Sequence, residues 1–221
     1  MNRLTTKMLF DTKNTLVGAF LEKSVFPWEI IPKIRELIMM VGEALDVREY
    51  EKVGECVYIS KSAKIDKDAR IEGACIIGRD TVLRKGAYLR GNCIIGNRCV
   101  VGNSSEIKNS ILFNECQAPH FNYIGDSILG RGAHLGAGAK ISNLKSDKSL
   151  ISINVSGDKI KTNLKKLGAV VGDGVEIGCN AVLNPGTVIG KEAVIYPLSS
   201  VRGYVSERCI YKNNGHVVKK R

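Results

Sequence analysis

The chain has 221 residues, of which 44% are hydrophobic and 25% are charged, and its formal net charge is +11. This composition excludes a wholly disordered chain, and the length is sufficient for one domain with a buried core. No apolar run approaches the roughly 20 residues of a membrane helix, and residues 1–10 lack the apolar region and cleavage site of a secretory signal. We therefore expect a cytoplasmic protein with no membrane partner.

The seven cysteines are odd in number and include no Cys-x-x-Cys pair. We interpret them as free, mostly buried thiols in a reducing compartment, and we expect neither disulfides nor a bound metal. The positive charge is spread along the chain, and no motif combines aromatic and basic residues, so we expect no nucleic-acid partner. A diffuse positive charge suits small anionic substrates.

Residues 1–50 contain a helical pattern. Apolar residues recur at the spacing of one helix face, namely Ile30, Ile34, Leu37, Val41 and Leu45. We expect this helix to cap the first coil of the domain that follows, because the edge strand there would otherwise be unpaired. The alternative is a helix that binds a partner.

Residues 51–113 repeat with a period of six. Every sixth residue is large and apolar: Val53, Ile59, Ile65, Ile71, Ile77, Leu83, Leu89, Ile95, Val101, Ile107 and Phe113. The period returns between Val171 and Val201. Neither a helix nor a single strand has this period, but a short strand followed by a tight corner does. The pattern predicts an all-β fold and resembles left-handed parallel β-helices, in which three hexapeptides form one triangular coil. Cys75 and Cys93 should then stack inside the coil.

Glycine often follows the large apolar residue. It does so at Gly78, Gly96, Gly102, Gly136, Gly172, Gly178 and Gly190. We expect these positions to be corners whose backbone dihedral angles favour glycine.

The repeat loses its register between Phe113 and Leu135, and residues 142–168 interrupt it. The interruption is rich in lysine and holds an alternating apolar stretch followed by Ser-Gly-Asp, which predicts an arm with a β-hairpin. This arm is well placed to reach a neighbouring subunit and the phosphates of a ligand. We divide the chain into a helical cap (1–50), a β-helix domain (51–210, with the arm at 142–168) and a basic tail (211–221).

Residues 119–126 lie inside the loss of register and read Pro-His-Phe-Asn-Tyr-Ile-Gly-Asp. We interpret His120 as a general base that removes a proton from an amine or hydroxyl, the usual task of an imidazole near neutral pH. The alternative is a structural histidine.

Arg90 and Lys108 are 18 residues apart, as are Glu72 and Arg90. In coil register they form one column, with neighbours about 4.8 Å apart. Two cations this close repel unless an anion lies on them, which favours a phosphate site. The alternative is a solvated column that Glu72 partly neutralises.

The residues between 102 and 143 carry His-x-x-Tyr-x-Gly-Asp followed by Gly-Ala-Gly. They resemble the acetyltransferase domain of the bifunctional UDP-N-acetylglucosamine pyrophosphorylase/glucosamine-1-phosphate N-acetyltransferase family, over roughly residues 50–210. The resemblance implies a homotrimer with each active site between two subunits. It also implies acetyl-CoA as the co-substrate and transfer of its acetyl group to the amine of an amino-sugar phosphate.

The resemblance assigns roles residue by residue. The general base matches His120, and the sugar-phosphate contacts match Arg90, Lys108, Tyr123 and Asn143. The acetyl-CoA contacts match Ala137, Cys179 and Pro197. Glu106, in the same stretch as Lys108, and Lys148, in the lysine-rich arm, are included among the expected substrate contacts.

The chain departs from the family pattern at several positions. His134 replaces an asparagine that commonly touches the sugar, Pro197 replaces an alanine that lines the CoA channel, and Leu144 follows Asn143 in place of a tyrosine. The alternative function is therefore a catalytically inactive trimeric scaffold or regulatory subunit. A second alternative enzyme is one with a zinc site of the carbonic-anhydrase kind. Such a site needs three clustered histidines, and this chain has only His120, His134 and His216, so we do not favour it. Residues 1–50 are too short for the family's nucleotidyltransferase domain, so we expect no pyrophosphorylase activity.

Overall fold

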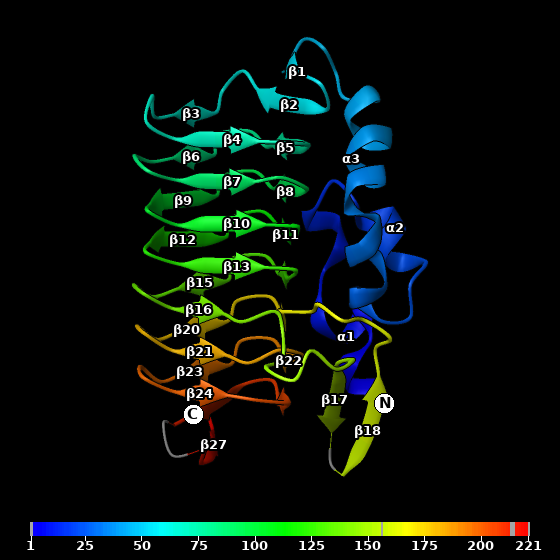
Figure 1. The fold of residues 1–221 in the computed structure, drawn as a ribbon, viewed down its shortest axis with the longest axis vertical. Coiled ribbons are helices and arrows are strands. Elements are labelled where there is room, and N and C mark those ends of the chain that lie inside the picture. The colour runs from blue at the N-terminus through cyan, green and yellow to red at the C-terminus, as the bar shows by residue number, and fades with distance from the viewer. Residues whose placement is uncertain (1, 156, 213–214, 221) are drawn as a thin grey trace.

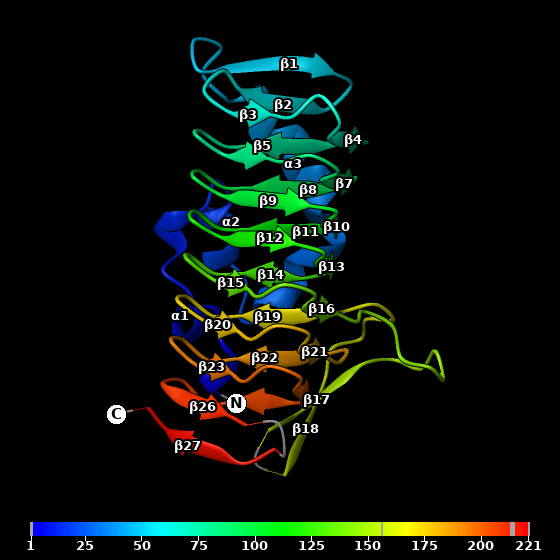
Figure 2. The same cartoon turned by 90° about the vertical axis from the view of Figure 1, so that its left-hand side faces the viewer.

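The computed structural model describes residues 2–155, 157–212 and 215–220. Its body is a stack of coils, and each coil contributes one short strand to each of three sheets (Figures 1 and 2). Strands of successive coils pair in parallel, as Cys75 with Cys93 and Leu83 with Val101. The predicted parallel β-helix of hexapeptide repeats is confirmed.

We name the sheets A, B and C in the order in which the chain visits them. Sheet A contains β1 (Tyr50–Gly54), β2 (Val57–Ser60), β5 (Cys75–Ile77), β8 (Cys93–Ile95), β11 (Ser110–Leu112), β14 (Ile128–Leu129), β19 (Ala169–Val171), β22 (Thr187–Ile189) and β25 (Tyr204–Val205). Sheet B contains β3 (Lys64–Ile65), β6 (Val82–Leu83), β9 (Val100–Asn103), β12 (Gln117–His120), β15 (His134–Leu135), β20 (Glu176–Ile177), β23 (Val194–Ile195), β26 (Cys209–Tyr211) and β27 (Val217–Lys219). Sheet C contains β4 (Arg70–Glu72), β7 (Tyr88–Arg90), β10 (Glu106–Lys108), β13 (Tyr123–Gly125), β16 (Lys140–Ile141), β21 (Val182–Leu183) and β24 (Ser200–Val201).

The coil shortens by one residue at the corner between sheets C and A. Ile107 pairs with Leu89, 18 positions earlier, but the next strand pairs Ile111 with Ile94, 17 positions earlier. Asn109 alone turns this corner and takes a φ of 46°. The loss of register therefore begins before Phe113, earlier than the hydrophobic pattern predicts.

Two residues of the predicted six-residue series, Phe113 and Val53, do not occupy the stacked positions expected for them. Because of the shorter corner, Leu112 rather than Phe113 pairs with Ile95. Phe113 is fully buried, with its ring centroid 4.9 Å from that of Phe10 in the N-terminal segment. Val53 lies in the antiparallel strand β1 and is 53% exposed.

The predicted reason for the repeated glycines is also wrong. None of the seven glycines that follow a large apolar residue has a positive φ. A Cβ atom on Gly78 would lie 2.5 Å from the Gly96 carbonyl carbon, and one on Gly136 would lie 2.7 Å from the Cys179 backbone nitrogen. These positions are glycine because the backbone of the next coil occupies the space of a side chain.

The cysteines behave as predicted. All seven thiols are free: Cys56, Cys75, Cys93, Cys99 and Cys116 are buried, Cys209 is partly exposed and Cys179 is exposed. Cys75 and Cys93 occupy paired positions inside the coil. Burial raises the pKa of Cys75 to about 12.

The arm contains the predicted hairpin, formed by β17 (Ser152–Val155) and β18 (Asp158–Lys161). Residues 146–150 are exposed and project from the stack (Figure 2), whereas the part of the arm that begins at Ile151 packs on the later coils. Ile151 and Ile153 are fully buried, and a Cβ atom on Gly186 of a later coil would lie 2.6 Å from Cγ2 of Ile151. The apolar residues of the arm therefore fill part of the core of the coil.

The N-terminal helices run along the outside of sheet A (Figure 1). They are η1 (Asn2–Leu4), α1 (Thr6–Leu9), η2 (Thr12–Asn14), α2 (Gly18–Glu22), η3 (Pro27–Lys33) and α3 (Ile34–Glu43). Ile34 and Ile38 of α3 are fully buried. The predicted helix is thus present as η3 and α3, but it covers a side of the stack instead of its end. None of the helices in the described ranges has the length and apolar character needed to cross a membrane.

Antiparallel strands cover both ends of the stack. Strand β1 pairs with β2 of the first coil, and β27 pairs with β26 of the last. These strands occupy edges that would otherwise be open to pairing with other chains. Part of the predicted basic tail is thus a strand, whereas Asn213, Asn214 and Arg221 lie outside the described residues.

Candidate active site

One corner of the β-helix carries the predicted base and all three predicted acetyl-CoA contacts. This corner joins sheets B and C, and it stacks Asn103, His120, Ala137, Cys179 and Pro197 on successive coils. His120 pairs with Asn103, and the next residues bond back to the column: Gly138 N donates to the His120 carbonyl over 3.0 Å, and Asn180 N to the Ala137 carbonyl over 2.9 Å. We call this set of five residues the corner column.

Close backbone packing holds the corner column together. Leu198 N donates to the Cys179 carbonyl over 3.0 Å. A Cβ atom on Gly178 would lie 2.3 Å from the nitrogen of Pro197, so only glycine fits beneath this proline. Pro197, which departs from the family pattern, therefore fits the same tight corner as the other members.

The imidazole of His120 is free to act on a ligand. The residue is exposed, and its side chain makes no hydrogen bond or ion pair within the described chain. Its backbone is fixed, because His120 N donates to Oδ1 of Asn122 over 3.1 Å. Asn122 is 3% exposed and also donates from Nδ2 to the Gly136 carbonyl over 2.8 Å. A buried amide thus holds the turn from which His120 projects.

Two backbone N–H groups of the corner column have no acceptor. Neither Ala137 N nor Cys179 N donates a hydrogen bond in the described part of the chain, although Gly136, Gly138 and Ala139 all donate to carbonyls. The two donors lie on consecutive coils, next to His120 in the stack. They suit the carbonyl oxygens of an extended acyl carrier, because a backbone donor strongly favours an acceptor.

The outward side of sheet C carries the predicted sugar-phosphate contacts. The register places Lys108 next to Arg90, as predicted. Each cation has its own carboxylate: Arg90 Nη1 lies 2.7 Å from Oε1 of Glu106, and Lys108 Nζ lies 3.9 Å from Oδ2 of Asp126. Hydrogen bonding to Glu106 raises the pKa of Arg90. Glu72, which partly neutralises the column in the alternative interpretation, bonds to Tyr88 and Arg70.

Asp126 joins three consecutive corners between sheets C and A. Its residue is 4% exposed, and its carboxylate accepts hydrogen bonds from Nδ2 of Asn109 over 2.7 Å and from Nδ2 of Asn143 over 2.5 Å. Its backbone carbonyl accepts a bond from Gly168 N, where the arm returns to the coil, over 2.9 Å. Asp126 therefore fixes Asn143 at the base of the arm.

Gly125 leaves room for Tyr123 and Asn143 to approach one another. A Cβ atom on Gly125 would lie 2.7 Å from Nδ2 of Asn143 and 2.8 Å from the Tyr123 hydroxyl. Burial raises the pKa of Tyr123, so its hydroxyl stays protonated near neutral pH and can donate a hydrogen bond. The Tyr-Ile-Gly-Asp sequence thus builds one polar cluster.

Lys148 and His134 lie apart from this cluster. Lys148 is exposed in the arm, at a turn closed by its backbone N–H and the Lys145 carbonyl. His134 Nδ1 lies 2.8 Å from Oε2 of Glu176, so a carboxylate already occupies this ring nitrogen. In the described chain no group of three or more His, Cys, Asp or Glu side chains is arranged to hold a metal ion.

Sequence reasoning treated Asp126 only as a neighbour of His120 and did not identify Asn109 or Asn122. The available signal was the shortened corner. A single residue that turns a corner must take a left-handed backbone conformation, which Asn and Asp tolerate better than most residues. Asn109 and Asp126 have φ values of 46° and 48°.

Comparison with known families agrees with this architecture. Residues 72–167 match the GMPPB C-terminal domain, and residues 168–203 match the bacterial transferase hexapeptide (six repeats). Together the two matches span more than half of the chain. The coil that follows the arm is thus similar to hexapeptide-repeat transferases, and the part before it is similar to the GMPPB C-terminal domain. The resemblance stated from its motifs is confirmed.

The curated relatives include two-part enzymes. A bifunctional protein GlmU of Methanococcus vannielii is 36% identical over 118 residues, which are 53% of this chain and 28% of that protein. A bifunctional sugar-1-phosphate nucleotidylyltransferase/acetyltransferase of Sulfurisphaera tokodaii is 39% identical over 92 residues, which are 42% of this chain and 23% of that protein. The matched part is thus about a quarter of the length of these relatives.

Solved structures of similar shape include the acetyltransferase domain of PglB from Neisseria gonorrhoeae in complex with acetyl coenzyme A. It has a TM-score of 0.34 and 14% identity, and the match covers 82% of this chain and 63% of that one. The polysialic acid O-acetyltransferase OatWY has a TM-score of 0.39 and 15% identity over 74% of this chain and 84% of that one. At these scores neither structure bears on the assignment.

Proposed function

We propose that this chain is a CoA-dependent N-acetyltransferase that moves the acetyl group of acetyl-CoA to the amine of an amino-sugar phosphate. The observation that carries the proposal is the corner column, which brings His120 together with Ala137, Cys179 and Pro197. These residues are far apart in the sequence and match the family's base and acetyl-CoA contacts. Relatives named as sugar-1-phosphate acetyltransferases support the reaction class.

The corner column suits an extended thioester. The N–H groups of Ala137 and Cys179 offer donors to carbonyls along the carrier, and His120 follows on the adjacent coil. The neutral amine attacks the thioester carbonyl, the carbon–sulfur bond breaks, and CoA leaves as its thiol. His120 accepts the proton that the amine nitrogen loses and returns it to the leaving sulfur.

The outward side of sheet C, with Arg90, Lys108, Tyr123 and Asn143, suits the sugar phosphate. Arg90 and Lys108 provide two positive charges on adjacent strands, and Tyr123 and Asn143 provide neutral donors beside them. A phosphate there competes with Glu106 and Asp126 for these cations, so we propose that the anion binds at the outer edge of existing ion pairs. Charge-assisted bonds to phosphate are the strong class of protein hydrogen bonds.

The proposal includes a cytoplasmic homotrimer, as the family resemblance implies. The alternative, an inactive trimeric scaffold or regulatory subunit, is favoured by one observation. His134 stands where the family has a sugar-binding asparagine, and its ring is bound to Glu176.

The test is release of free thiol from acetyl-CoA with a panel of amino-sugar phosphates and their unphosphorylated analogues. His120→Ala should lower kcat by roughly 10²–10⁴-fold, the usual contribution of a general base. His216→Ala, near the far end of the chain, is the matched control and should retain full activity.

The panel also tests the phosphate contacts. Arg90→Ala should weaken binding of the phosphorylated substrate by about tenfold and binding of its unphosphorylated analogue much less. If no member of the panel releases thiol, or if His120→Ala keeps more than about a third of the activity, the alternative function as an inactive scaffold or regulatory subunit is favoured.

A further inference from the structure

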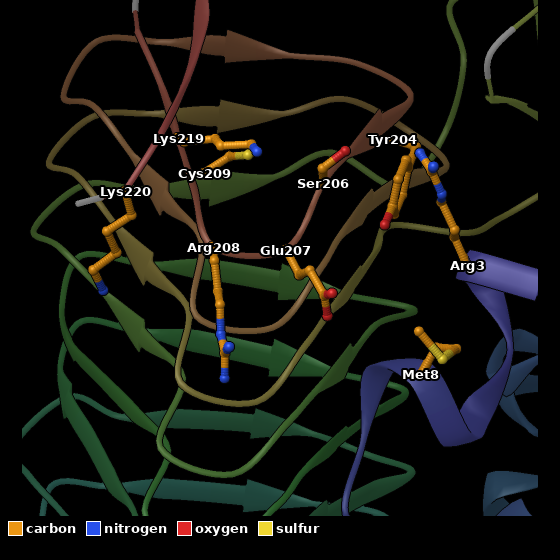
Figure 3. Close-up of a pocket in the computed structure, with 9 residues that line it drawn as sticks. All are labelled: Arg3, Met8, Tyr204, Ser206, Glu207, Arg208, Cys209, Lys219 and Lys220. Carbon is orange, nitrogen blue, oxygen red and sulfur yellow. The ribbon is translucent and has the colours of Figure 1, made fainter.

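A cavity lies at the opposite end of the molecule from the first coil. It has a volume of about 540 Å³ and is enclosed by both ends of the sequence (Figure 3). Arg3 and Met8 come from the N-terminal helices, Tyr204 and Arg208 from the last coils, and Lys219 from β27. Sites for small molecules typically have volumes of roughly 300–1,000 Å³.

The charged side chains that line this cavity are mostly positive. Four cations line it, Arg3, Arg208, Lys219 and Lys220, against one carboxylate, that of Glu207. Arg208 is held by Glu192, with Nε 3.0 Å from Oε2. Across the described residues, no carboxylate lies within 4.0 Å of the charged groups of the other three cations.

Several cations on the corners of the coil do have a carboxylate neighbour, as Arg98 has Glu115 at 2.6 Å and Arg79 has Glu49 at 3.3 Å. In Figure 3, Arg3 lies on one side of the cavity and Lys219 and Lys220 on the other, with Arg208 between them. A hollow lined by four cations and one carboxylate attracts an anion.

One wall of the cavity is apolar. Tyr204 lies beside Arg3 in Figure 3, and Met8 lies below them with 44% of its surface exposed. Partial burial raises the pKa of Tyr204, so its ring stays neutral. An aromatic ring and a thioether suit the flat, weakly polar part of a ligand.

The cavity is distinct from the corner column. Its central residues, Glu207 and Arg208, join sheet A to sheet B, whereas His120 turns from sheet B to sheet C. The N-terminal helices form one of its walls, and they contribute nothing to the corner column.

We infer that this cavity is a second binding site, for a phosphorylated molecule that carries an aromatic ring. The phosphates lie among Arg3, Arg208, Lys219 and Lys220, and the ring packs on Tyr204 and Met8. Because the site joins the two ends of the chain, its ligand also fastens the N-terminal helices to the last coils.

The experiment measures binding of ADP, pyrophosphate and adenosine to the full chain by titration calorimetry at fixed ionic strength. ADP should bind about tenfold more tightly than either fragment, because only ADP meets both walls. Arg3→Ala should weaken ADP about tenfold. Arg35→Ala, which removes an exposed arginine of α3 outside the cavity, is the matched control and should change nothing.

Three results would overturn the inference. Equal losses of ADP affinity in Arg3→Ala and Arg35→Ala would show that ADP responds only to diffuse surface charge. Equal affinities for ADP and pyrophosphate would remove the role of Tyr204 and Met8. Binding that survives Arg3→Ala but is abolished by Ala137→Trp would place ADP in the corner column. Acetyl transfer by Arg3→Ala, measured separately, should match the wild type, so failure of this site leaves the proposed reaction intact.

Discussion

Gly125 illustrates how one missing side chain shapes the candidate site. Its Cβ position is within 2.8 Å of both Tyr123 and Asn143, and both neighbours are side-chain atoms that are able to move. Gly125→Ala should therefore displace these side chains. We expect a rise of at least tenfold in KM for the sugar phosphate and a loss of unfolding free energy of about 1–3 kcal/mol. Gly54→Ala, whose nearest neighbour would be 3.7 Å away, is the control for stability and activity.

The thiols give a prediction about reactivity. With a pKa of about 12, Cys75 carries thiolate in only about one molecule in ten thousand at pH 8, and it is fully buried as well. A thiol reagent at pH 8 should label Cys179 first, then Cys209, and should reach the other five only on unfolding. The thiolate fraction of Cys75 rises as pH approaches 12, so its protection should weaken in strong alkali. Rapid native labelling of more than two thiols, counted by mass spectrometry, would contradict this assignment of burial.

At the scale of elements, the arm shows what a local pattern predicts and what it does not. Alternating apolar residues and a turn predict a hairpin, and the structure contains it. The same pattern does not say that Ile151 faces Gly186, more than thirty residues later in the chain. The helix α3 behaves in the same way, because its apolar stripe predicts burial but does not specify the surface that buries it.

The packing of the arm is testable with neighbouring residues. Ile151 is fully buried, whereas Leu150 is 58% exposed. Ile151→Ala should lower the free energy of unfolding by about 2–5 kcal/mol, as is usual for truncation of a buried aliphatic side chain. Leu150→Ala, the matched control, should change it by about 0.5 kcal/mol or less. Similar values for the two variants in urea denaturation would show that the arm does not pack on the coil.

At the scale of the whole molecule, the N-terminal helices restrict assembly. They cover the outside of sheet A, so a second copy can approach only the faces of sheets B and C over most of the stack (Figures 1 and 2). Both candidate clusters lie on those faces or on the corner between them.

This arrangement supports the proposed homotrimer with sites between subunits. Light scattering at micromolar concentration should give three times the mass of the chain. Phe121→Asp places a charge on an exposed apolar residue beside His120 and should dissociate the assembly if this corner faces a partner. Met40→Asp, on α3 and similarly exposed, is the control and should not. A stable monomer of the wild type would leave the proposed site without its second wall.

The sequence by itself determined the β-helix, because a period of six over many coils has one simple solution, in which equivalent residues stack. Its motifs also point to His120, Tyr123 and Asn143 as candidate site residues. Only the tertiary structure decided that Asp126 binds both Asn109 and Asn143, since those bonds join three successive coils that lie side by side only in the folded chain. Likewise, only the folded chain brings Arg3 to Arg208, because contacts between the two ends of a chain leave no periodic signal in it.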